Sequence, residues 1–107
     1  MTPIRPKRNP EIVWRLEKGI HMMAWDKARK GEEYEELAVL TLMIEKSIHQ
    51  LNLVGAEIWT RINGANSVEK IAAEVATLFD WDANEAEEAV LEFLKGIEER
   101  GWVTLGK

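Results

Sequence analysis

The 107-residue chain contains no cysteine, and this absence excludes several kinds of chemistry. Disulfides, thiolate catalysis and sulfur-based zinc sites all need cysteine. Long apolar runs are missing too, since none approaches the roughly 20 residues that cross a bilayer. The basic N-terminal stretch lacks the apolar core of a signal peptide. We therefore expect a cytoplasmic protein that does not associate with membranes.

Groups that carry catalysis are equally scarce. The two histidines, His21 and His49, lie on different expected elements, and no spacing requires them to converge with a carboxylate on a metal. Ser47 and His49 are two residues apart on an expected strand, with no acid to orient the imidazole of a nucleophile–base pair. Glycine-rich phosphate loops are absent. The sequence therefore predicts no enzyme, no metal and no cofactor.

Charge is unevenly distributed around a net value of −5. The first ten residues hold Arg5, Lys7 and Arg8 and no acid, whereas residues 80–100 hold eight acidic residues against two basic ones. Nucleic acids bind mainly by having their phosphates neutralised, so this acidic half disfavours them as partners. A basic or neutral partner fits better, although the acidic residues also fit a simple solvated helix face.

The length allows one domain with a single core. All three prolines fall in residues 1–10, which we expect to form an extended basic arm, leaving residues 11–107 as the domain. Alternating apolar residues predict a strand over residues 11–17. Residues 20–25 are consistent with a continued strand, and residues 26–36 are charged enough for an exposed loop.

Two further strands complete the expected sheet. Residues 37–45 are apolar on both faces, which indicates a central strand. After a tight turn, the sequence IHQLN predicts a short third strand. An antiparallel meander of three strands follows.

From Asn52 the apolar period changes to that of helices, and three are predicted. Asn52 is the expected N-cap of the first, with Leu51, Val54, Ile58 and Ile62 as its buried stripe and Gly64 beyond its end. The second begins near Ser67, where Asn66 and Glu69 have the spacing of a capping box. Asp82 caps the third and Gly101 ends it. The fold class is thus α+β, a three-stranded antiparallel sheet followed by three helices, similar to a winged helix-turn-helix.

Winged helices usually read DNA, which makes a DNA-binding transcriptional regulator the alternative function. The outward face of the second predicted helix carries Glu69, Lys70, Glu74 and Thr77, and the third helix is acidic. This alternative predicts steeply salt-dependent retardation of duplex DNA. The charge makes it the weaker interpretation.

The order of short motifs resembles the PqqD family of peptide chaperones, also called RiPP recognition elements. The resemblance covers residues 48–103 well and residues 11–17 loosely. The matching motifs, in order, are Leu51-Asn52, Ile58-Trp59, Gly64, Ser67 to Ala72, and then Ala86, Val90, Phe93, Leu94 and Gly101. Each motif alone is generic, so the signal lies in their order and spacing.

The resemblance implies a non-catalytic domain that binds the leader of a ribosomally synthesised precursor peptide. It would present the leader to a modifying enzyme, in many such systems a radical S-adenosylmethionine (SAM) maturase. The leader would add as a strand to the sheet edge, in a cleft between the third strand and the third helix. A structural or regulatory subunit that binds another protein's tail in the same groove is a third hypothesis.

The residues of this chain give that expectation specific positions. Backbone pairing is assigned to the third strand, at Ser47, Ile48, His49, Gln50 and Leu51. A column at helical spacing on the third helix is assigned to selectivity, at Glu87, Leu91, Leu94 and Glu98. Leu91 also fits a peripheral core position. Two-sided apolar strands and the basic arm are consistent with a monomer or a weak homodimer.

Overall fold

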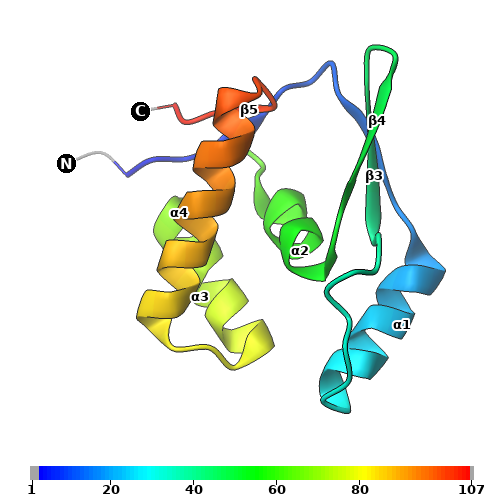
Figure 1. The fold of residues 1–107 in the computed structure, drawn as a ribbon. Coiled ribbons are helices and arrows are strands. Elements are labelled where there is room, and N and C mark those ends of the chain that lie inside the picture. Colours follow the sequence, from blue (N-terminus) through cyan, green and yellow to red (C-terminus); the bar gives the residue numbers. More distant parts are fainter. Residues whose placement is uncertain (1–2, 107) are drawn as a thin grey trace. The chain divides into compact units, whose positions relative to one another are not determined.

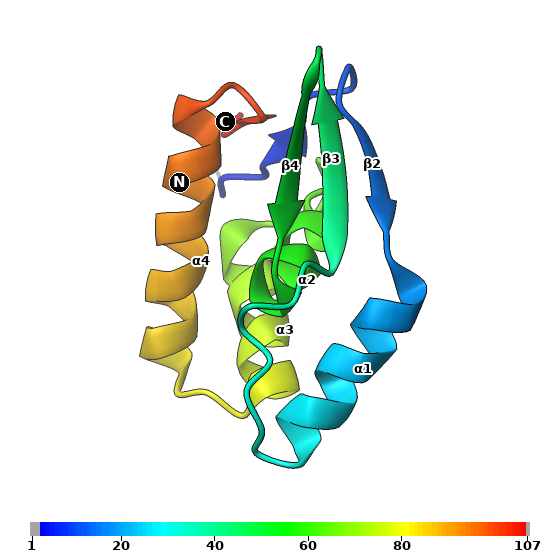
Figure 2. The ribbon, with the colours of Figure 1, turned by 45° about the vertical axis from the view of Figure 1, so that its right-hand side comes forward.

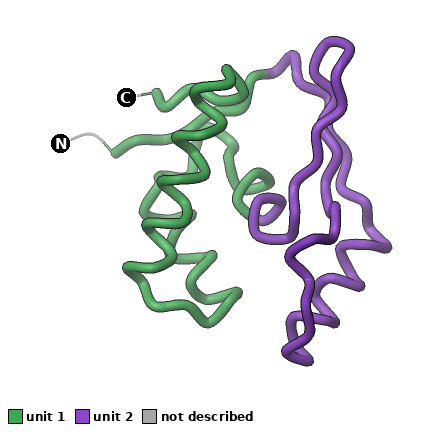
Figure 3. Tube along the Cα trace, viewed as in Figure 1, with its two compact units in different colours: residues 1–9, 58–107 green, residues 10–57 purple. Residues whose placement is uncertain are grey.

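The computed structural model describes residues 3–106, an α+β fold with a three-stranded antiparallel sheet (Figure 1). The chain forms two compact units, each described below by itself (Figure 3). One runs from Pro10 to Glu57, and the other combines the residues up to Asn9 with those from Ile58 onward. The division falls inside helix α2 (Leu53–Arg61).

The Pro10–Glu57 unit contains the three-stranded sheet. Its strands are β2 (Val13–Leu16), β3 (Leu40–Ile44) and β4 (Ser47–Leu51), in the spatial order β2-β3-β4 (Figure 2). The predicted meander and its central strand are confirmed. A two-residue turn, Glu45–Lys46, joins β3 to β4, and Glu45 has a φ of 56°, as turns that match the twist of a hairpin require.

The register separates the sheet into a buried and an exposed face. Leu40 and Leu42 of β3 are fully buried, whereas Met43 between Leu42 and Ile44 is 52% exposed. Because successive side chains of a strand point to opposite faces, each residue shares a face with its cross-strand partner. Met43 lies opposite Val13 on one side and Ile48 on the other. The face that carries Met43 is therefore open there.

Helix α1 (Lys18–Arg29) lies between β2 and β3 and corrects the expectation of a continued strand and loop. Three helices were predicted, and residues 3–106 contain four. His21 and Trp25 are one turn apart and contact the same oxygen of Glu57, with His21 Nε2 at 2.7 Å and the Trp25 indole donating at 2.9 Å. Ala24 between them is fully buried. This face of α1 is fixed by a carboxylate from α2, a distant residue that local periodicity does not reveal.

Replacing Glu57 by alanine is expected to lower the free energy of unfolding by about 1–3 kcal/mol, because the indole and imidazole nitrogens lose their buried acceptor. Urea denaturation followed by circular dichroism measures the change. Glu57→Gln keeps an acceptor oxygen and is the control, expected to lose less. Equal stability of the alanine variant and the wild type would contradict this role.

The second unit contains α3 (Val68–Phe79) and α4 (Ala83–Glu99), together with the second half of α2. Strands β1 (Lys7–Arg8) and β5 (Val103–Thr104) form a two-stranded antiparallel sheet. The N-terminal segment is also held elsewhere, since the carbonyls of Ile4 and Pro6 accept from the N–H groups of Val68 and Gly64 at 3.0 Å each.

Helix ends follow the predicted chemistry with one exception. Asp82 caps α4, as predicted, and forms a capping box with Glu85. Gly64 and Gly101 have φ values of 81° and 78°, left-handed values that suit glycine after a helix. Helix α3, however, is capped by Ser67, whose hydroxyl accepts from the Lys70 N–H.

Buried stripes agree with the prediction only in part. Helix α2 buries Leu53, Ala56, Ile58 and Trp59, and Ile62 is buried just after the helix ends. The predicted Leu51 and Val54 are half-buried. Helix α4 buries Ala86, Val90, Leu94 and Ile97 along one stripe, whereas Ala89 and Phe93, which helical spacing also places on that stripe, are half-buried.

Candidate functional site

Strand β4 has one open long edge. Among residues 3–106 it pairs with β3 alone. The Leu51 carbonyl accepts from the Val39 N–H at 2.8 Å, so the backbone groups of Leu51 face β3. Backbone direction alternates along a strand, so we expect those of Ser47 and His49 to face β3 too. The N–H and C=O groups of Ile48 and Gln50 then face the open side.

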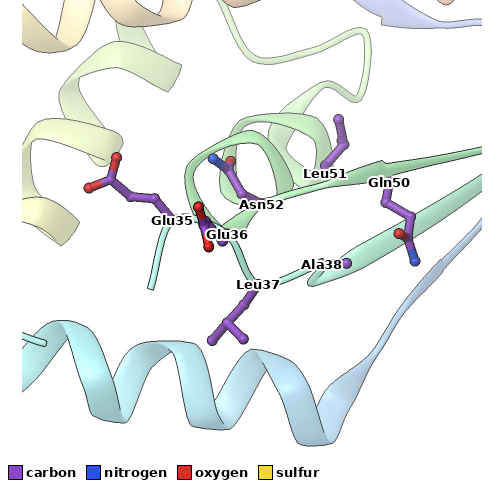
Figure 4. Close-up of a pocket in the computed structure, with 7 residues that line it drawn as sticks. All are labelled: Glu35, Glu36, Leu37, Ala38, Gln50, Leu51 and Asn52. Atoms are coloured by element: carbon purple, nitrogen blue, oxygen red, sulfur yellow. The ribbon is translucent and has the colours of Figure 1, made fainter. Parts of the chain in front are cut away.

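Side chains alternate as well. Ile48 is 67% exposed and Gln50 is exposed, whereas His49 and Leu51 are half-buried on the opposite face. Figure 4 shows the side chains of Gln50 and Leu51 on opposite sides of β4. No proline interrupts the strand. An extended peptide therefore has a ladder of groups with which to pair.

Local sequence limits β4 at both ends. The exposed Glu45–Lys46 turn precedes it, and Asn52 ends it by capping α2. The Asn52 side-chain oxygen accepts from the Gly55 N–H at 3.0 Å, and its carbonyl accepts from the Ala56 N–H at 2.8 Å. The predicted N-cap is thus confirmed. The edge is only five residues long, a length that limits edge-to-edge aggregation.

The four residues assigned to the α4 column differ in accessibility. Glu87 and Glu98 are exposed, and Leu91 is 46% exposed. Leu94 is 1% exposed and belongs to the core. Of these four side chains, the ones open to a partner are therefore two carboxylates and one leucine.

A hollow of about 400 Å³ lies at the end of β4, within the Pro10–Glu57 unit (Figure 4). Its lining comes from the loop before β3 and from the end of β4, and consists of Glu35, Glu36, Leu37, Ala38, Gln50, Leu51 and Asn52. The Leu37 side chain points toward α1. Sequence reasoning expected an exposed loop up to residue 36 and a strand from residue 37, whereas β3 begins at Leu40. It therefore missed the hollow.

The lining of the hollow carries negative charge from two glutamates. Glu35 and Glu36 are exposed, and neither forms an ion pair within residues 3–106. Burial and the nearby negative charge of Glu35 raise the pKa of Tyr34. Both effects disfavour the charged phenolate.

Within the described residues, no three His, Cys, Asp or Glu side chains are placed to hold an ion. His21 Nε2 lies 2.7 Å from Glu57 Oε2, and this carboxylate is shared with Trp25. Among those same residues, no helix has the length and apolar character to cross a membrane.

Comparison with known proteins agrees with the arrangement of these elements. The profile of the family described as "Coenzyme PQQ synthesis protein D (PqqD)" matches residues 39–103, which include β3, β4 and all of α2 to α4. A search of curated proteins gave no match.

One similar solved structure is the solution structure of the PqqD part of Methylobacterium extorquens PqqCD, described as a functional, stand-alone RiPP recognition element. The TM-score is 0.63 at 15% sequence identity, covering 94% of this chain and 88% of that chain. The likeness is one of fold. With more than half of its length matched by the family profile, the chain belongs to the PqqD family.

Proposed function

We propose that this protein binds the leader of a ribosomally synthesised precursor peptide and presents it to a modifying enzyme. The observation that carries the proposal is the unpaired edge of β4, in a chain of the PqqD family. The similar solved structure is of a protein described as a RiPP recognition element, which supports a role in recognition without catalysis.

Binding is proposed to begin with backbone pairing along Ser47–Leu51. An extended leader satisfies the outward N–H and C=O groups of Ile48 and Gln50, giving affinity that depends little on sequence. Side chains that flank the paired segment then supply selectivity.

The exposed residues of α4 are the proposed source of part of that selectivity. Glu87 and Glu98 favour basic leader residues, and Leu91 offers apolar contact area. Leu94 is buried, so its proposed contribution is to pack α4 against the hydrophobic core and not to contact the leader. The enzyme that receives the leader is proposed to be a radical SAM maturase, and the carrier itself a monomer or weak homodimer.

Titration of the isotope-labelled protein with a synthetic leader tests the proposal. The leader comes from a short reading frame beside a gene for a radical enzyme. Amide signals of residues 47–51 and 87–98 are expected to shift together at micromolar peptide. A scrambled peptide of the same composition is the control, expected to move neither set. Unmoved signals in both segments at saturating leader would remove the assignment.

A further inference from the structure

A row of exposed apolar side chains crosses the open face of the three-stranded sheet. Val13 of β2 pairs with Met43 of β3, and Met43 pairs with Ile48 of β4. Their side chains are 66%, 52% and 67% exposed, respectively. One apolar residue from each strand thus lies side by side, and the row ends at the open edge of β4.

The next row on the same face is polar. It contains Arg15, Thr41 and Gln50, which are paired in register. Arg15 and Thr41 both donate to Glu17 Oε2, at 3.0 and 2.9 Å. The side chains of Arg15 and Thr41 thus have hydrogen-bond partners within the unit. The three apolar side chains have no polar atoms and cannot hydrogen-bond with water. Single exposed apolar residues are ordinary, whereas contiguous exposed apolar side chains are typical of interaction sites.

We infer that the leader places an apolar side chain beside Ile48 and extends this row as its fourth member. The inference rests on the proposed strand addition at β4. A residue directly opposite Ile48 in an added strand shares its face, with Cβ atoms about 4.5–5.5 Å apart. The leader residue two positions away then lies beside Gln50 in the polar row. Recognition therefore favours an apolar and a polar residue separated by one position.

The apolar row ends at the open edge of β4, where the leader is proposed to pair, and for this reason we assign the leader as the partner of the row. Any strand that pairs with Ile48 and Gln50 must place every second side chain on this face. A second copy lying flat on the face is a poorer fit, because stable interfaces bury about 800 Å² per partner and a row of three side chains offers much less. A β-branched or aromatic residue is the preferred type, as in cross-strand pairs generally.

Selection from a randomised peptide library by mRNA display, using the full chain, tests the inference. Peptides enriched by the wild type are expected to share an apolar residue at one fixed position and a polar residue two positions away. Selection with Ile48→Thr is expected to lose the apolar preference, while Ile48→Val retains it. Threonine favours strands, so the hairpin is preserved, and urea denaturation verifies this.

Binding measurements with one enriched peptide sharpen the result. Ile48→Thr is expected to weaken its Kd about two- to fivefold, the size of a cross-strand pair. The loss should vanish when the apolar peptide residue is itself replaced by threonine. Val13→Thr is the matched control, because it changes the same row on the far strand and should leave the Kd unchanged.

Other outcomes overturn the inference. Equal losses of peptide affinity for Val13→Thr and Ile48→Thr would mean that the peptide covers the whole face instead of extending the row at the edge of β4. Enriched peptides that bind at β4, as shown by loss of binding to Ile48→Pro, but lack the apolar preference would reject the row while leaving strand addition intact. A selection that enriches no peptide would remove both proposals.

Discussion

Replacing Ile48 by proline is expected to weaken leader binding about tenfold or more while the domain stays folded. Proline lacks a backbone N–H, and the N–H of Ile48 faces the open side of β4 rather than β3. The ladder within the sheet therefore loses no donor, and proline is tolerated on edge strands. A leader carbonyl left without its partner in the complex costs about 1–3 kcal/mol. Fluorescence anisotropy with a labelled synthetic leader measures the Kd.

Two other variants isolate the backbone effect. Ile48→Ala removes the side chain but keeps the N–H, so its loss of affinity should be much smaller. His49→Pro removes a donor that faces β3 and should destabilise the hairpin itself. Should Ile48→Pro bind the leader as well as Ile48→Ala does, pairing at β4 would not be the source of affinity.

Replacing Leu94 by alanine is expected to lower the free energy of unfolding by about 2–5 kcal/mol, since the side chain is almost fully buried and its removal leaves a cavity. Leu91 lies one turn earlier on α4 and is 46% exposed. Leu91→Ala should change stability by only about 0.5 kcal/mol or less, and it should weaken leader binding instead. Urea denaturation measures the loss of stability of Leu94→Ala, and the dependence of the free energy of unfolding on urea concentration should be unchanged.

The pair of variants separates structural from contact roles on one helix. Because both change leucine to alanine, they remove the same atoms from different surroundings. If Leu91→Ala left leader affinity at the wild-type value, Leu91 would be a peripheral core residue, the alternative that the sequence also allows. Equal destabilisation by both would contradict the burial that distinguishes them.

Sequence reasoning succeeded where local chemistry decides the structure. Strand β4 follows from a short alternating segment that ends at a helix-capping residue. Asn52 and the Asp82–Glu85 pair cap helices through residues two to four positions away. The family resemblance used one of these features, Leu51-Asn52 at the end of the strand. All depend on neighbours in the chain, so a single sequence contains the information.

It failed where a distant residue decides. The sequence of helix α1 was interpreted as a continued strand and a loop. The contact that holds this helix comes from Glu57, 36 residues from His21, and the local sequence does not reveal it. The hollow at Glu35 and Glu36 depends on how a loop passes the end of β4. Neither of these leaves a periodic signal.

The brevity of β4 has a kinetic consequence for a carrier. Five residues span about 17 Å at the rise of an extended strand, so a bound peptide gains few backbone contacts. Affinity differences between related complexes reside mainly in dissociation rates, so a short footprint implies brief residence. Such rapid turnover suits the proposed function, in which the bound leader has to pass on to an enzyme's active site.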